Sequence, residues 1–336
     1  MTTGAMEGLL YCGNILIPSL FPFAVFSALA VKSGFAESFG RWLSPISKRL
    51  FHTDGTVATV ILLGFAGGFP IGAKGVATLY EERKISKVTA QALTMFLVGG
   101  GVGFTVTVIG VSFYRNVVVG LILWGCQIFS QILLGVIACR KIKYQPIDNR
   151  KIQRKGLSEC IVKSTKSGVE SMLLLCGMVV LFSCIFGIVE DVGIIEYIEF
   201  LLEKLSLPVG MSKSLPCILW EVTKGCQSCF NEGCPLWLIS FALGWGGICV
   251  HFQIYALVSE LEISKGKFML YRLCQGGISA VLSLIVMKFY QPTVNVYGTV
   301  SKYTANLSTA NYTGSVALIG MSLIFIGMCN SNVAKK

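Results

Sequence analysis

The chain has 336 residues, of which 54% are hydrophobic and 13% are charged, and its formal net charge is +11 at pH 7. Six apolar runs approach or exceed the roughly 20 residues with which a helix crosses a bilayer, and this excludes a water-soluble globular protein. Lipid offers the backbone no hydrogen-bond partners, so these runs are expected to form helices. We therefore predict an all-α polytopic membrane protein, without a separate signal peptide because the N-terminus is short and polar.

The first half of the chain, residues 1–139, is expected to form one repeat. Its elements are a span at 9–31, an interfacial helix at 35–51, a hairpin at 56–84, and spans at 88–111 and 117–139. The interfacial helix is indicated by apolar residues at helical spacing: Phe35, Phe39, Trp42, Leu43, Ile46 and Leu50. The hairpin contains GFAGGFPIGAK at 64–74, where glycines and a proline interrupt an apolar run and stop the helix.

A basic stretch at 140–166 follows the first repeat. It contains nine Lys or Arg residues, against the two acids Asp148 and Glu159. By the positive-inside rule it is expected to be a cytoplasmic linker between two spans. Binding of anionic lipid or of nucleic acid is the alternative interpretation of this charge. Because the basic residues are concentrated beside the spans, no nucleic-acid partner is expected.

The second half, residues 167–290, has the same order of parts. Its elements are a span at 167–189, an interfacial helix at 192–206, a hairpin at 212–234, and spans at 235–257 and 267–290. The second interfacial helix has Ile194, Ile195, Ile198, Leu201, Leu202 and Leu205 on one face. Residues 291–336 are expected to form a polar outer loop and a short final span at 316–329.

The charges of the two interfacial helices predict opposite orientations for the two halves. The first region is basic, with Lys32, Arg41, Lys48 and Arg49, whereas 190–206 has five acids against Lys204. The positive-inside rule places the basic region in the cytoplasm and the acidic region outside. This requires an odd number of crossings between them, which is obtained if 56–84 enters and leaves the membrane on one side. We therefore predict an inverted structural repeat with two re-entrant helical hairpins, 56–84 from the cytoplasm and 212–234 from outside.

Two of the expected spans contain a glycine-rich stretch at which the helix is expected to break. They read VGGGVGF at 98–104 and GWGGICVHFQ at 244–253. Inverted repeats place a substrate site near the membrane midplane, where broken helices meet. Irregular backbone at that depth is tolerated where it is buried in protein or lines a wet cavity. The substrate site is therefore expected at the hairpin tips and these two glycine-rich breaks.

The order of elements resembles the core of concentrative nucleoside transporters. More closely, the chain resembles the YlbJ-type sporulation integral membrane proteins, which contain the nucleoside recognition (Gate) domain, over about residues 7 to 290. The matching stretches are IPSLFPFAVFS (17–27), GFAGGFPIGAK (64–74), EVTKG (221–225) and LGWGGICVHFQIYALVSELEI (243–263), followed by Arg272.

This resemblance implies an anion transporter in an endospore-forming bacterium, because members of the group are implicated in moving dipicolinic acid toward the spore. Nucleoside-transporter relatives form trimers, so a homo-oligomer is also implied. The chain departs from the family where a polar cluster of Asn, Thr, Ser and Pro is usual, since residues 96–104 read FLVGGGVGF. This loss of side-chain ligands favours a second interpretation, a membrane component that keeps the fold without transporting.

Two lysines are candidates for holding a dicarboxylate between the tips, with help from half-helix N-termini. Lys74 follows the inner tip, and Lys224 follows Thr223 at the outer tip. Each lysine has an alternative role, either extending to the interface or pairing with a nearby acid. For Lys224 that acid is Glu221 at spacing i, i+3.

Further polar residues that are candidates for binding the substrate or a coupling ion lie near the second hairpin tip and the second glycine-rich break. Glu221 is an acid in a short apolar segment, and it is a candidate carrier of a coupling proton or ligand of sodium. His251 is a candidate for binding or protonation, although a lone histidine in a bundle more often bonds between helices. The expected substrate-binding residues are Gly68, Phe69, Pro70, Gly72, Lys74, Gly100, Gly101, Glu221, Thr223, Lys224, Gly247, His251 and Gln253.

Other polar residues are given structural roles. Gln127 and Gln131, four apart on one helix face, are expected to join helices. The cluster Cys226, Cys229 and Cys234 begins like a metal half-site, but no second pair follows at ligand spacing, so inert thiols are expected, with an external disulfide as the alternative.

The sequence contains no catalytic constellation and no ATP-binding loop, so neither an enzyme nor a directly ATP-driven pump is expected. We predict a secondary transporter or facilitator of a small anionic metabolite in the bacterial cell membrane or the membrane around the forespore. Alternatives are a nucleoside-type transporter and a non-transporting sporulation component. No metal or organic cofactor is expected, only a coupling proton or sodium ion, and the expected partners are the solute and the lipid bilayer.

Overall fold

The computed structural model describes residues 2–142, 144 and 156–290, and in these ranges the chain forms helices and no strands. The all-helical fold expected from the sequence is thereby confirmed. The final span at 316–329, the loop before it and the middle of the basic linker lie outside the described residues.

The first span is a succession of three helical segments that run without interruption. They are α1 (Thr2–Tyr11), the π-helix η1 (Cys12–Leu16) and α2 (Ile17–Lys32). Helix thus begins seven residues before the expected start at residue 9, because nothing in the polar N-terminal residues stops it. After a turn at Gly34, whose φ is 80°, the amphipathic helix α3 (Phe35–Phe51) leaves α2 at 83°.

The segment with the broken middle folds as two antiparallel helices, α4 (Gly55–Gly67) and α5 (Phe69–Glu81). Asp54 caps α4 by accepting a hydrogen bond from the Thr56 amide at 3.0 Å. Gly68 joins the helices with φ 87°, a left-handed conformation that favours glycine. The two helices approach closely, since a Cβ on Gly64 would lie 2.9 Å from the Cα of Gly72.

A buried lysine fixes the far end of this hairpin. Lys84 donates to the carbonyl of Val31, near the C-terminus of α2, and pairs with Glu37 of α3. Both side chains of the pair are almost completely buried. A cation is favourable at a helix C-terminus, so Lys84 joins α2, α3 and the hairpin at one point.

The expected span at 88–111 is two half-helices. The first, α6 (Lys87–Phe96), is capped by Ser86, and the second is the π-helix η2 (Gly103–Phe113). The residues between them, 97–102, include the triple glycine. Next, α7 (Val117–Cys139) is capped by Asn116, whose side chain accepts from the amides of Val118 and Val119.

The second half presents the same order of elements. They are α8 (Leu157–Asp191), α9 (Ile194–Lys204), α10 (Val209–Trp220), α11 (Val222–Asn231), α12 (Leu236–Trp245), α13 (Gly247–Leu257), the 3-10 turn η4 (Ser259–Leu261) and α14 (Lys265–Phe289). The antiparallel pair α10 and α11 is joined at Glu221. The expected linker at 140–166 is shortened, because α8 begins ten residues before the expected span.

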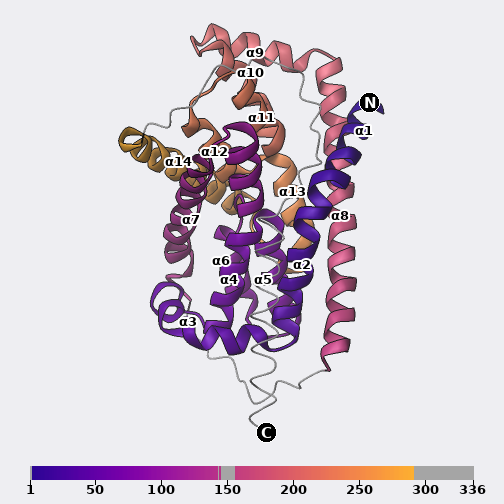
Figure 1. The fold of residues 1–336 in the computed structure, drawn as a ribbon, viewed down its shortest axis with the longest axis vertical. Coiled ribbons are helices and arrows are strands. Elements are labelled where there is room, and N and C mark those ends of the chain that lie inside the picture. Colours follow the sequence, from indigo (N-terminus) through magenta and orange to yellow (C-terminus); the bar gives the residue numbers. More distant parts are fainter. Residues whose placement is uncertain (1, 143, 145–155, 291–336) are drawn as a thin grey trace. The chain divides into compact units, whose positions relative to one another are not determined.

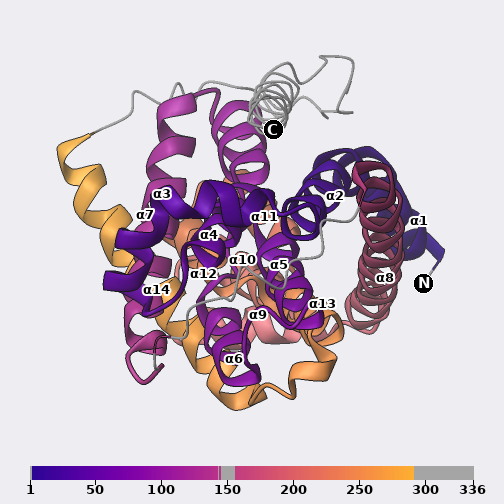
Figure 2. The same cartoon turned by 90° about the horizontal axis from the view of Figure 1, so that it is seen from below.

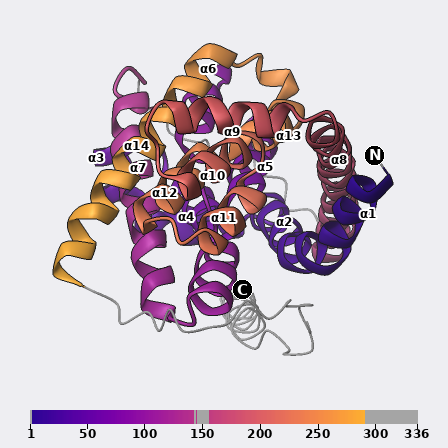
Figure 3. The ribbon, with the colours of Figure 1, turned by 90° about the horizontal axis from the view of Figure 1, so that it is seen from above.

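Four helical stretches of the described residues are long and apolar enough to cross a membrane, and a fifth is added if the bent pair α2–α3 counts as one span. They are α7, α8, the stretch from α12 to α13, and α14. Within the unit Met1–Pro292, α1, α2 and α8 pack together on one side (Figures 2 and 3). The amphipathic helices α3 and α9 lie at opposite ends of this unit (Figure 1).

Two buried apolar clusters hold the unit together. The larger one joins both antiparallel helix pairs to α6, α7, α12, α13 and α14, and the smaller one joins α1, α2 and α8 to α5 and α13. Because both clusters include α5 and α13, these two short helices lie where the sides of the unit meet. Burial at this position keeps water from their ends and sets the environment of the candidate site.

Candidate functional site

Each helix-pair tip packs directly on the helix break of its own half. In the first half, a Cβ on Gly68 would lie 2.5 Å from the amide nitrogen of Gly101. In the second half, a Cβ on Gly247 would lie 2.9 Å from the Cα of Glu221. The backbones thus touch without intervening side chains, and glycine is required at these positions.

The two halves also meet each other at this level. A Cβ on Gly246 would lie 3.3 Å from the ring of Phe69 at the first tip, and a Cβ on Gly100 would lie 2.9 Å from Leu243 of α12. Pro70 and Gly72 are buried beside the first tip, and a Cβ on Gly72 would lie 2.1 Å from the carbonyl oxygen of Leu97. The structure therefore brings together the tip and break glycines that the sequence selected.

Four half-helices begin near these contacts, and their N-termini differ in capping. Glu221 caps α11, since its carboxylate accepts from the amides of Thr223 at 2.9 Å and Lys224 at 2.7 Å. The other three, α5 after Gly68, η2 after Val102 and α13 after Gly246, receive no side-chain cap within the described part of the chain. Uncapped amides at a helix N-terminus carry partial positive charge and favour an anion. Pro70 supplies no such amide in α5.

Lys224 does not pair with Glu221, and that alternative from the sequence is wrong. Its ammonium instead lies 3.0 Å from the carboxylate of Glu7 in α1 and 4.6 Å above the ring of Phe186 in α8. The hydroxyl of Thr223 lies 2.9 Å from that of Tyr11, also in α1. The second tip is therefore tied to α1 by two polar contacts.

Lys74 lies on α5, beyond the first tip. Its side chain is half-buried and makes no hydrogen bond or ion pair with another described residue. Because Lys224 is already paired with Glu7, the two lysines are not equally available to a dicarboxylate in this conformation. Among the described residues, Lys74 is the one of the two whose ammonium has no hydrogen-bond or ion-pair partner.

His251 is 3% exposed and surrounded by aromatic rings of α12, α13 and α14. Its ring centre lies 4.4 Å from that of Trp245 and 5.4 Å from that of Phe268. Its Nε2 atom is buried without a hydrogen-bond partner among the described residues. Gln253 is also buried, and its amide lies 3.3 Å from the sulfur of Cys249. Both side chains therefore face protein rather than lipid.

Arg272 was not among the expected site residues, although it follows a matching motif in the sequence. It is completely buried and donates to the carbonyl oxygens of Met95 and Val98, at the end of α6. It forms no ion pair with an acid in the described ranges. The signal that could have identified it is a charged residue within an apolar span.

A buried polar network adjoins the first break. Gln127 donates to the carbonyl of Ser240 at 2.8 Å and to the hydroxyl of Ser279 at 2.7 Å, and Gln275 donates to Gln127 at 3.1 Å. The Oε1 atom of Gln275 has no partner among the described residues. The network joins α7, α12 and α14, the role expected for Gln127.

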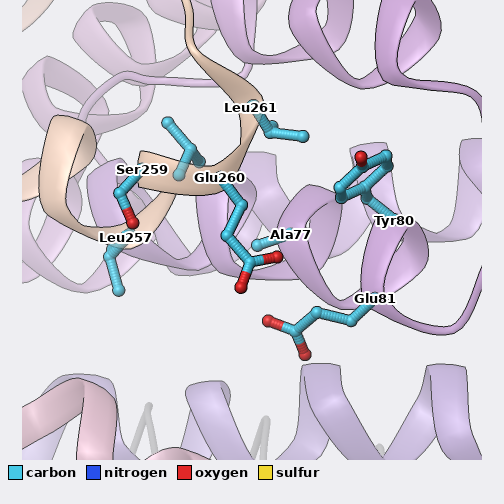
Figure 4. Close-up of a pocket in the computed structure, with 8 residues that line it drawn as sticks. Ala77, Tyr80, Glu81, Leu257, Ser259, Glu260 and Leu261 are labelled. Atoms are coloured by element: carbon cyan, nitrogen blue, oxygen red, sulfur yellow. The ribbon is translucent and has the colours of Figure 1, made fainter.

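A pocket of about 180 Å³ lies at the far end of α5, away from the first tip. It is lined by residues from α5 and from the segment 257–261, and the carboxylates of Glu81 and Glu260 point toward each other in it (Figure 4). Beside it, Lys87 pairs with Glu262, and this hydrogen bond lowers the pKa of Glu262 and raises that of Lys87. No expected site residue lines this pocket.

The cysteine cluster on α11 and in the turn after it is buried. Cys226, Cys229 and Cys234 are free thiols, and no group of three His, Cys, Asp or Glu side chains in the described ranges is placed to hold a metal ion. The cluster packs α11 against α10 and α12 as part of the larger apolar core.

Comparisons of the sequence with known proteins found a family model and a curated relative that match. Residues 15–118 match the Gate family, described as nucleoside recognition. Over 310 residues the chain is 25% identical to the sporulation integral membrane protein YlbJ of Bacillus subtilis (strain 168), covering 84% of this chain and 76% of that protein. No solved structure matches the chain.

Proposed function

We propose that this integral membrane protein is a secondary transporter or facilitator of a small anionic solute. Its match to the Gate family over residues 15–118 and its similarity to a sporulation integral membrane protein over 84% of the chain support this proposal. The proposal rests on one arrangement. The N-terminus of α13 at Gly246 contacts the ring of Phe69 at the start of α5, and neither helix has a side-chain cap in the described part of the chain. Arg272 is buried at the first break and is unpaired with any described acid. Half-helix N-termini that meet at a break bind anionic substrate groups in transporters.

We propose that the two halves are inverted relative to each other, with both helix pairs re-entrant. Two observations support this. The basic helix α3 and the acidic helix α9 lie at opposite ends of their unit (Figure 1). In addition, Gln127 and Gln275 occupy the eleventh position of α7 and α14 and hydrogen-bond to each other at 3.1 Å, as expected near a symmetry axis.

Thiol labelling tests this orientation. We expect cysteines introduced at Arg83 and at Glu196, both exposed, to react with a membrane-impermeant reagent from opposite sides of sealed vesicles. The two cysteines are introduced into the Cys274→Ser/Cys329→Ser variant. Cys274 is the exposed thiol of the described ranges, and Cys329 lies outside them. This parent variant alone should not react. Reaction of both cysteines from the same side would contradict the inverted repeat.

In the proposed mechanism, the tip at Glu221 and the tip at Gly68 alternately give the solute access to opposite sides. The present contacts of Thr223 with Tyr11 and of Lys224 with Glu7 hold the second tip against α1. Opening on that side requires these contacts to break. Glu221 and His251 are the candidates for a coupling proton, with sodium as the alternative ion. The mechanism includes no catalytic step and no cofactor.

Uptake into proteoliposomes tests the function. We expect uptake of labelled dipicolinate, the dicarboxylate implied by the family resemblance, and weaker uptake of nucleosides. Lys74→Gln should raise the KM for the dicarboxylate about tenfold, because a hydrogen bond to a charged group contributes about 1.5 kcal/mol and about 1.4 kcal/mol is a factor of ten. Lys48→Gln, which removes an exposed cation from α3, should leave the KM unchanged. Preferred uptake of nucleosides would instead favour a nucleoside-type transporter.

A non-transporting membrane component is the second candidate. It is favoured by the composition of the first break, where Gly99, Gly100 and Gly101 provide no side-chain ligands. Such a protein would take up neither class of solute. It would also show no rise in thermal midpoint with dipicolinate or nucleosides, whereas a ligand that binds the folded state raises the midpoint.

A further inference from the structure

The first break leaves one helix end that needs a partner. α6 ends at Phe96, and residues 97–102 do not continue it. The last carbonyls of a helix have no intrahelical donor and carry partial negative charge. Hydrocarbon supplies no donor either, so these groups must be bound by protein, water or an ion.

Arg272 supplies this partner from α14. Its Nη2 atom donates to the carbonyl oxygen of Met95 at 2.5 Å, and its Nη1 atom donates to that of Val98. The ring of Phe268 covers the group, with its centre 5.3 Å from the guanidinium carbon. Carbonyl dipoles and an aromatic face thus surround the charge.

This charge is not neutralised by an acid in the described part of the chain. Arg272 is 0% exposed and has no carboxylate partner there, and its Nε atom lacks an acceptor. A buried charge in a membrane protein is costly and normally pairs with an opposite charge. Here the guanidinium is held by carbonyls at a half-helix C-terminus, which is how broken helices of transporters hold a coupling cation.

The corresponding position of the first half carries no charge. Trp124 is the eighth residue of α7, as Arg272 is the eighth of α14. The indole of Trp124 donates to the carbonyl of Phe65, near the C-terminus of α4, at 3.1 Å. Both halves therefore place a donor at a half-helix end, but only the donor at the first break is a cation.

We propose that Arg272 is a tethered cation that occupies the first break in place of a dissociable coupling ion. The positive charge that other transporters bind and release at such a break is here part of α14. Binding at the break stands on the geometry alone, whereas its meaning for coupling rests on the proposed transport function. Sodium or potassium then has no place at this break, and a proton on Glu221 or His251 remains as the coupling ion.

Thermal unfolding of the full chain in detergent tests the tethered cation. The wild type should have the same midpoint in sodium, potassium and choline chloride at equal ionic strength. Arg272→Ala should unfold several degrees lower and recover most of this loss in millimolar guanidinium chloride, because the free ion fills the vacated position. Arg41→Ala, which removes an exposed arginine of α3, should show neither the loss nor the recovery.

Two variants of similar volume keep the test informative if Arg272→Ala does not fold. Arg272→Lys should retain more of the wild-type midpoint than Arg272→Met, because it keeps the charge. A methionine variant as stable as the wild type would overturn the proposal, as would stabilisation of the wild type by sodium over choline. Uptake that is equal with and without a sodium gradient supports the coupling part. If the protein transports no solute, only the inference about coupling fails. Recovery of the unfolding midpoint of Arg272→Ala by guanidinium does not require transport, so it still tests the binding of Arg272 at the break.

Discussion

Gly68→Ala is expected to lower the free energy of unfolding by about 3 kcal/mol and to abolish solute uptake. Two costs add. The left-handed φ of 87° costs a residue with a Cβ about 1 kcal/mol, and the overlap of that Cβ with the Gly101 backbone at 2.5 Å costs about 2 kcal/mol. Relief of the overlap moves the first tip away from the first break. Thermal unfolding in detergent and uptake into proteoliposomes measure the two effects.

Gly103→Ala is the matched control for this variant. Gly103 begins η2 just after the same break, and a Cβ built on it meets nothing within 4 Å. Unfolding midpoint and uptake should both stay close to the wild type. If Gly68→Ala matched this control in both measurements, the contact between tip and break would have no importance for stability or transport.

Glu221→Ala and Glu221→Gln are expected to separate the structural role of this acid from its role in coupling. Alanine removes both acceptors that cap α11 and should lower the free energy of unfolding by about 2 kcal/mol, whereas glutamine keeps one acceptor and should lose about half as much. If Glu221 carries the coupling proton, glutamine should abolish the increase in uptake caused by a proton gradient. Uptake without a gradient should persist.

Asp54→Ala controls for the loss of a cap alone. Asp54 caps α4, the first arm of the other helix pair, and lies away from both tips. Its removal should cost about 1 kcal/mol and leave the response to a proton gradient intact. A full response to the gradient in Glu221→Gln would exclude Glu221 as the proton carrier and leave His251.

Local patterns in the sequence predict most of the helices. The apolar spacing of Phe35 to Leu50 marks α3, and the caps Asp54, Ser86 and Asn116 precede helices in the way that their short polar side chains favour. The Gly and Pro residues of 64–74 locate the turn at Gly68, because few other residues accept its backbone conformation. The positions of the breaks and tips therefore follow from backbone chemistry that is local in the sequence.

Contacts between distant segments could not be predicted in this way. The spacing of Glu221 and Lys224 suggested a pair on one helix face, but Glu221 sits at the cap, where its carboxylate turns to the amides. Lys224 then binds Glu7, which is 217 residues away. Arg272 likewise contacts carbonyls 174 and 177 residues away. No periodicity specifies such partners, since they depend on how the halves pack.

The length of α8 has a consequence for how the two halves are connected. Its 35 residues extend about 52 Å, whereas the hydrocarbon layer is about 30 Å thick. Even a tilt of about 40° leaves the helix roughly 10 Å too long for that layer. At least two turns therefore lie outside the hydrocarbon layer, among headgroups or in water, as suits the charged residues at the two ends of α8: Glu159, Lys163 and Lys166 at one end, and Glu190 and Asp191 at the other. The connection between the halves thus begins its second helix outside the hydrocarbon layer, where charged side chains keep their hydration.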